Sequence, residues 1–147
     1  MLYPIRALAI LVLLIPAAAA AQKCTEQFVK DATGKPTGTP AELKASDVYF
    51  YAPFLPKPVV GAQQWKSAVQ TNMPKRTNQN SGNMTPDRIV VSPDAEMAYA
   101  YGSTSGSFND DSGKHQDLTI AYLEVWRVVD GSCKLAARMV EPEGDHK

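Results

Sequence analysis

The 147-residue sequence contains only two cysteines and two histidines, and it has no excess of charge of either sign. Two cysteines with two distant histidines are too few and too scattered for a typical zinc site. Lys and Arg together number 15, as do Asp and Glu, so the formal net charge is +0. No basic stripe marks a nucleic-acid surface. We therefore predict no metal site and no nucleic-acid partner.

The chain also lacks a long hydrophobic run outside its N-terminus. There, Arg6 precedes the short apolar run Ala7–Ile15, and the small residues Ala17–Ala21 follow. This pattern predicts a signal peptide over residues 1–21, cleaved before Gln22. The apolar run is too short for a comfortable membrane span. We expect a secreted or periplasmic protein with no stable membrane insertion after cleavage; the alternative is an uncleaved anchor.

The two cysteines, Cys24 and Cys133, suggest one disulfide in an exported protein. Such a bond would join the mature N-terminus to the last part of the chain. It would close a loop of about 100 residues, which corresponds to about 4–5 kcal/mol in the chain-entropy model. Two free thiols, or an intermolecular bridge through Cys24, are the alternatives.

The stretch from Arg88 to Glu141 predicts three long β-strands. They cover Met97–Phe108, Asp117–Val129 and Lys134–Glu141. The second is rich in β-branched and aromatic residues and has no Gly or Pro, as is typical of a strand. Asp130-Gly131 between two apolar runs is a strong hairpin signal, because Gly adopts positive φ at little cost.

The hairpin register predicts which side chains share a face. A two-residue turn places Trp126 opposite Leu135 and Glu124 opposite Ala137, while Arg138 lies on the other face. A bulge would shift these partners. Glu124 is then one carboxylate among large apolar neighbours, where it costs several kcal/mol unless paired, hydrogen-bonded or protonated.

The earlier part of the chain is irregular. Residues 22–46 predict a lead-in: a helix within Gln22–Thr33, a Gly/Pro-rich linker, and a brief helix that starts at Thr39-Pro40. Residues 47–141 predict the main domain and 142–147 a frayed tail. Within the main domain we expect a strand at Val48–Tyr51, a helix at Ala62–Asn72 and a loop at Lys75–Pro86.

Helices followed by a long antiparallel meander predict an α+β fold. We expect a curved antiparallel sheet whose apolar face is covered by the short N-terminal helices. A pocket between helices and sheet follows from that geometry.

Three motifs carry a resemblance to a known family. They are the segments Val48–Trp65, Val90–Ser103 and Leu123–Val140, which include a Tyr-x-Tyr-Gly strand and a Val-Trp-Arg strand leading into an Asp-Gly hairpin. This order resembles the nuclear transport factor 2-like proteins, and more narrowly their SnoaL-like and ketosteroid isomerase-like branch, with its small exported members of unknown function. The resemblance implies a cone-shaped α+β fold with an internal pocket.

The sequence departs from this family at several points. The lead-in is shorter than the long opening helix of the family, Cys133 stands where a Trp is usual, and Glu124 stands where a small polar residue is frequent. The Asp general base of the isomerases and the Asp–His dyad of dehydratases have no counterpart that we can place. The resemblance therefore implies the fold, and no family activity transfers residue by residue.

Glu124 and a set of aromatic residues are the candidate site. The pocket is predicted to be lined by Tyr49, Tyr99, Tyr101, Tyr122, Glu124 and Trp126. A carboxylate in an apolar pocket with phenolic donors is equipment of the general acid–base kind. The structural alternatives are a buried Glu124 satisfied by a Tyr or a backbone N–H, or an exposed Glu124 paired with an Arg. His115 and His146 are expected to be solvated.

Three functions are consistent with these features. The first is an exported protein that binds a small, largely apolar molecule. The second is a cofactor-independent isomerase- or cyclase-like enzyme, with Glu124 transferring the proton and a Tyr stabilising the oxyanion. The third is an interaction module that forms a homodimer through the outer sheet face around Thr119, Ala121, Leu123 and Val125. None of the three requires a cofactor.

Overall fold

The computed structural model describes residues 21–33 and 39–142. The predicted signal peptide up to residue 20, part of the Gly/Pro linker and the tail from residue 143 lie outside the described residues. Within the described part of the chain, no helix has the length and apolar character needed to cross a membrane.

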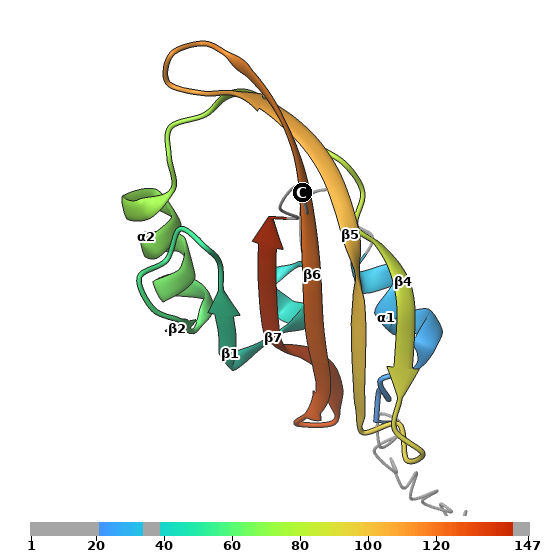
Figure 1. Cartoon of the computed structure of the whole chain (residues 1–147). Helices are drawn as coiled ribbons and strands as arrows, with labels where there is room; N and C mark the ends of the chain where they lie inside the picture. The colour runs from blue at the N-terminus through green and yellow to red at the C-terminus, as the bar shows by residue number, and fades with distance from the viewer. Residues whose placement is uncertain (1–20, 34–38, 143–147) are drawn as a thin grey trace, which may run out of the picture.

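A seven-stranded curved sheet forms the body of the protein (Figure 1). Its order is β2-β1-β7-β6-β5-β3, and β4 also pairs with β5. The three expected long strands are confirmed as β5, β6 and β7. All pairings are antiparallel except that of β1 with β7, so the sheet is mixed. The strands are β1 (Lys44–Tyr51), β2 (Val59–Val60), β3 (Thr77–Ser81), β4 (Thr85–Val91), β5 (Met97–Asn109), β6 (His115–Val129) and β7 (Ser132–Pro142).

Two short helices flank the sheet. The α2 helix (Ala62–Asn72) has the predicted bounds and lies beside β1 and β2, whereas α1 (Glu26–Thr33) lies by β4 and β5 (Figure 1). The helix expected from Thr39-Pro40 is reduced to a single 3₁₀ turn, η1 (Ala41–Leu43). It stops there because the next residue, Lys44, already begins β1.

The expected loop at Lys75–Pro86 is wrong, since it contains β3 and the start of β4. The sequence of β3 is Thr-Asn-Gln-Asn-Ser, and every one of its residues is exposed. A strand of this kind carries no hydrophobic alternation. It forms because it can extend the edge of β5 through backbone hydrogen bonds.

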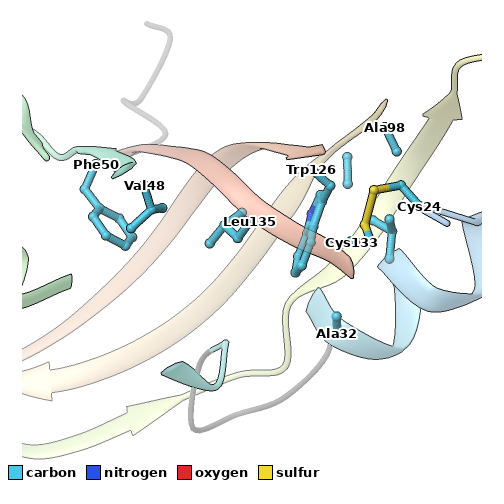
Figure 2. Packing of buried hydrophobic residues seen from close by; sticks show 10 residues of the cluster. Cys24, Ala32, Val48, Phe50, Ala98, Trp126, Cys133 and Leu135 are labelled. Carbon is cyan, nitrogen blue, oxygen red and sulfur yellow. A yellow bond between two sulfur atoms is a disulfide. The ribbon is translucent and has the colours of Figure 1, made fainter. Parts of the chain in front are cut away.

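The core fills the inner face of the sheet and is closed by the N-terminal segment. Trp126 and Leu135 are fully buried at its centre (Figure 2). The ring of Phe28 in α1 meets the Trp126 ring edge-on, with the ring centroids 6.0 Å apart. The predicted disulfide between Cys24 and Cys133 is present, with an S–S distance of 2.10 Å. Both sulfur-bearing residues are completely buried beside α1.

The β6–β7 register confirms part of the expected pairing and corrects the rest. Trp126 faces Leu135 as predicted. Glu124, however, faces Arg138 instead of Ala137. Arg138 therefore lies on the inner face beside Glu124, and the prediction that it points to the outer face is wrong.

A β-bulge causes this shift. The pairing slips between Val125 and Trp126, so that Ala136 is an extra residue in β7. Beyond the bulge, Tyr122 pairs with Val140, where a regular ladder would give Met139. A bulge bends its strand and changes the face of the residues that follow. Here it brings a guanidinium into the interior of the molecule.

Candidate functional site

The most buried polar group is the Glu124 carboxylate, which has no solvent exposure. Its Oε1 accepts hydrogen bonds from Arg138, including one from Nε at 2.7 Å and a second from Nη2. Its Oε2 accepts from Thr33 Oγ1 at 2.7 Å and from Trp126 Nε1 at 3.1 Å. Arg138 Nη2 also donates to Thr39 Oγ1 at 2.5 Å. Both carboxylate oxygens are thus satisfied by donors.

This network joins three parts of the chain. Thr33 ends α1 and Thr39 lies just before η1, whereas Glu124 and Arg138 belong to neighbouring strands. The sequence predicts either a buried Glu124 satisfied by a Tyr or a backbone N–H, or an exposed Glu124 paired with an Arg. In the structure Glu124 is buried and its partners include an arginine, Arg138, together with Thr33 and Trp126, neither of which the sequence indicates. No local sequence pattern brings Thr33 or Thr39 to β6, and the bulge that turns Arg138 inward is not readable from alternation.

A cavity of about 230 Å³ lies next to this network. Arg138 borders both, since its guanidinium bonds to Glu124 and its side chain also lines the cavity. The rings of Phe50 and Trp65 form an aromatic wall, stacked with centroids 4.8 Å apart. The lining residues are Phe50, Tyr51, Trp65, Ser81, Gly82, Met84, Thr104, Ile120, Tyr122, Arg138 and Val140.

Tyr122 is the one predicted ligand-binding tyrosine that lines this cavity. Its hydroxyl is buried without a hydrogen-bond partner among the described residues, and it lies against Gly102, where an added Cβ would be 3.0 Å from it. Burial, and then the negative charges of Glu124 and Asp87, raise the pKa of the Tyr122 hydroxyl far above its usual range. The phenol is therefore protonated at any physiological pH.

The other three predicted tyrosines lie elsewhere. Tyr49, Tyr99 and Tyr101 are 39%, 42% and 41% exposed. On β5 the buried positions are Ala98 and Ala100, so the large tyrosines alternate to the outer face. These three tyrosines therefore do not line the cavity beside Glu124, where the sequence predicts them. Trp126 is also absent from the residues that line the cavity, because its ring is packed in the core.

The outer face has a hollow of its own, of about 610 Å³. Its polar content is low, and large apolar side chains are exposed around it, with Met97 at 51% and Tyr99 at 42%. Leu123 and Val125 from β6 are among the residues that line it. The hollow is lined by Val90, Val91, Ser92, Pro93, Met97, Ala98, Tyr99, Leu123 and Val125.

His115 does not belong to this site. The His115 side chain is 63% exposed, and its Nε2 lies 3.4 Å from an exposed Asp117 oxygen. His146 lies outside the described residues. In residues 21–33 and 39–142, no three His, Cys, Asp or Glu side chains come together in a way that could hold a metal ion.

No protein-family model and no curated protein sequence matches the chain. Solved structures do. A ketosteroid isomerase-like protein from Erwinia carotovora atroseptica superposes with a TM-score of 0.55 at 15% identity, over 71% of this chain and 78% of that one. A Xanthomonas campestris protein, solved as a calcium/calmodulin dependent protein kinase II association domain, gives 0.54 at 18% identity over 80% of each chain.

A third match is a nuclear transport factor 2-like superfamily protein from Salmonella enterica serovar Typhimurium, with a TM-score of 0.52, 14% identity, and coverage of 82% of this chain and 84% of that one. At these identities the likeness concerns the fold alone. The expected cone-shaped α+β architecture is confirmed. The protein has the nuclear transport factor 2-like fold.

Proposed function

We propose that this protein binds a small, largely apolar molecule in the cavity beside Arg138. The observation that supports this most directly is the cavity itself, about 230 Å³ with a predominantly apolar lining. Ligand sites are typically concave and apolar with a few polar groups. For scale, an engineered apolar cavity of about 150 Å³ binds benzene. The space therefore suits a molecule of one or two rings.

The contacts of Glu124 favour a ligand-binding function over an enzymatic function with Glu124 as the proton-transfer group. Its two oxygens already accept four hydrogen bonds from Arg138, Thr33 and Trp126. It is not among the residues that line the cavity. A general base needs reach to the proton that it abstracts. The buried carboxylate thus supports a structural role.

Filling the cavity tests the proposal. The variant Val140→Phe enlarges a lining residue, and Met139→Phe makes a matched change one residue away, at a side chain that is 40% exposed and does not line the cavity. We expect wild type and Met139→Phe to retain small molecules through purification from the native host, as detected by native mass spectrometry. Val140→Phe should be empty. Equal retention by both variants would place the ligand elsewhere.

We also propose that the protein is exported. Support comes from the disulfide between Cys24 and Cys133, because such bonds persist in oxidising compartments. The signal-peptide prediction adds that the mature chain begins at Gln22. Intact mass measurement on protein from the periplasm or medium should give a chain starting there with the disulfide formed. A mass that includes residues 1–21, found in the cytoplasm, would contradict the proposal.

A second candidate function is self-association through the outer sheet face. The exposed Met97, Tyr99 and Tyr101 beside an apolar hollow favour it, because apolar patches of this kind mark interaction sites. A similar fold occurs in the Xanthomonas protein solved as an association domain. We expect Leu123→Lys to give a monomer by light scattering while ligand retention persists. Gln64→Lys on exposed α2 is the charge control and should leave the dimer intact.

A further inference from the structure

Arg138 is the one charged residue that lines the cavity in the described part of the chain. Its side chain is only 15% exposed, so its donors are directed by protein contacts and not by bulk solvent. Building on the proposed function, we infer that the ligand is electrically neutral and carries an oxygen acceptor, such as a carbonyl, which receives a hydrogen bond from Nη1 of Arg138.

Nη1 is the nitrogen of the Arg138 guanidinium whose hydrogens are not engaged by Glu124 or Thr39. An arginine has five N–H donors, one on Nε and two on each Nη. The Nε hydrogen goes to Glu124, and Nη2 donates to Glu124 and to Thr39. The donors that remain are the two on Nη1. Because Arg138 also borders the cavity, these donors are the ones available to a bound molecule.

The same arrangement disfavours a carboxylate ligand. Bidentate recognition of a carboxylate needs two parallel N–H groups on neighbouring nitrogens. The Nε–Nη2 edge of Arg138 is engaged by Glu124, and the second Nη2 hydrogen is engaged by Thr39. Arg138 therefore has no free pair of parallel N–H donors on neighbouring nitrogens for a carboxylate. A single carbonyl oxygen needs only one donor, which Nη1 can supply.

Charge balance points the same way. Glu124 is fully buried and neutralises Arg138. An anionic ligand would add an unbalanced negative charge to a mostly apolar space, and burying such a charge is costly. A neutral ligand leaves the pair balanced, and its ring can pack on the wall of Phe50 and Trp65.

Three probes of similar size separate these properties: ethylbenzene has no acceptor, acetophenone has a neutral carbonyl, and benzoate is an anion. Their dissociation constants can be measured by amide chemical-shift titration of the chain from Gln22. We expect acetophenone to bind about tenfold more tightly than ethylbenzene, as for a hydrogen bond to a charged donor. Benzoate should bind most weakly.

Variants assign the donor. Arg138→Met alone would leave Glu124 as an uncompensated buried charge and risks misfolding, so it is combined with Glu124→Gln, which keeps an acceptor for Thr33 and Trp126. In this double variant the preference for acetophenone over ethylbenzene should disappear, so that the two probes bind with similar dissociation constants. Tyr122→Phe tests the competing donor, because Tyr122 also lines the cavity and its hydroxyl has no partner among the described residues. If Arg138 is the donor, the preference for acetophenone over ethylbenzene should persist in Tyr122→Phe.

The outcomes distinguish this inference from the proposed function. If none of the probes binds the wild-type chain, cavity binding is wrong, and the inference falls with it. If acetophenone and ethylbenzene bind equally, or benzoate binds best, the cavity binds ligands but the neutral-acceptor inference is wrong. Loss of acetophenone preference in Tyr122→Phe would also overturn the assignment to Arg138.

Discussion

Glu124 shows how the contacts of a single residue decide its role. A carboxylate among apolar side chains is a reasonable candidate for acid–base catalysis. In this protein four hydrogen bonds and the Arg138 charge hold it in place. A buried pair of this kind adds little net stability over a well-packed apolar pair, yet removing one partner is costly. The main consequence of the Glu124–Arg138 pair is therefore that removing either side chain alone leaves the other buried without its counter-charge.

The pair predicts non-additive effects on stability. Arg138→Met should lower the free energy of unfolding by about 3–5 kcal/mol, because Glu124 is left buried and unpaired. The double variant Glu124→Gln with Arg138→Met should lose less than the sum of the single changes. Urea denaturation with a double-mutant cycle measures this coupling.

An exposed ion pair is the control for this cycle. Arg127 bonds to Asp47 at 2.6 Å, but their side chains are 42% and 59% exposed. Arg127→Met should cost only about 0–1 kcal/mol, since solvent screens such pairs. If Arg138→Met costs no more than Arg127→Met, the buried network does not have the strength that its geometry implies.

Part of this site is predictable from the sequence. Glu124 is predictable as a buried carboxylate because its neighbours on β6 are large and apolar. Arg138 is not predictable as its partner, because one extra residue, Ala136, changes the face of β7. The contacts from Thr33 and Thr39 depend on how the lead-in folds back over the sheet, which no local pattern encodes.

The elements of the meander were the most readable part of the fold. Alternation and the Asp130-Gly131 turn identify β6 and β7, because both strands have one apolar face. In β5 the sequence shows an alternation of small and aromatic residues, but it does not indicate which of the two sets faces the core. Ala98 and Ala100 face the core and Tyr99 faces out, because Ala98 lies opposite the bulky Trp126. The size of the residue on the neighbouring strand, and not the hydrophobicity of the β5 residues, therefore decides which face of β5 turns toward the core.

The turn before β5 contains a strained residue. Ala95 has a φ of 55°, a left-handed conformation that costs an alanine about 1 kcal/mol but costs glycine almost nothing. Ala95→Gly should therefore raise the free energy of unfolding by up to about 1 kcal/mol, as measured by denaturant titration. The matched change Ala68→Gly, within α2, should lower it by about 1 kcal/mol. Destabilisation by both changes would contradict the strain argument.

The β5–β6 turn is organised by Asp110. Hydrogen bonds from Ser112 and Gln116 hold the pKa of its carboxyl at about 2, below the usual 3.8. Because the folded-state pKa is depressed, its contribution to stability is present above pH 3.8 and is lost as the pH falls toward 2. Asp110→Asn should therefore make the hairpin less stable than in the wild type near neutral pH. The difference in stability should disappear as the pH falls toward 2. Carboxyl NMR titration should give a wild-type midpoint near 2; an ordinary midpoint would contradict this.

At the scale of the whole molecule, the lead-in is bonded to the sheet at several points. Cys24 bonds to Cys133, and the backbone N–H of Cys24 donates to Ala95 O at 2.9 Å. Gln22 N donates to Gly131 O at 2.7 Å. With the Thr33 contact to Glu124, these bonds close one end of the core. The short lead-in is thus held in place by covalent and polar links.

The disulfide joins residues 109 positions apart, and it should therefore contribute about 4–5 kcal/mol by restricting the unfolded chain. Replacing Cys24 and Cys133 together by Ala should lower the free energy of unfolding by that order. The loss of protection should be local before it is global, because α1 is tethered by the bond and α2 is not. Hydrogen exchange should therefore accelerate first in Glu26–Thr33, while Ala62–Asn72 serves as the internal control. Equal acceleration in both helices would mean that the bond stabilises only the whole fold and does not specifically hold the lead-in over the core.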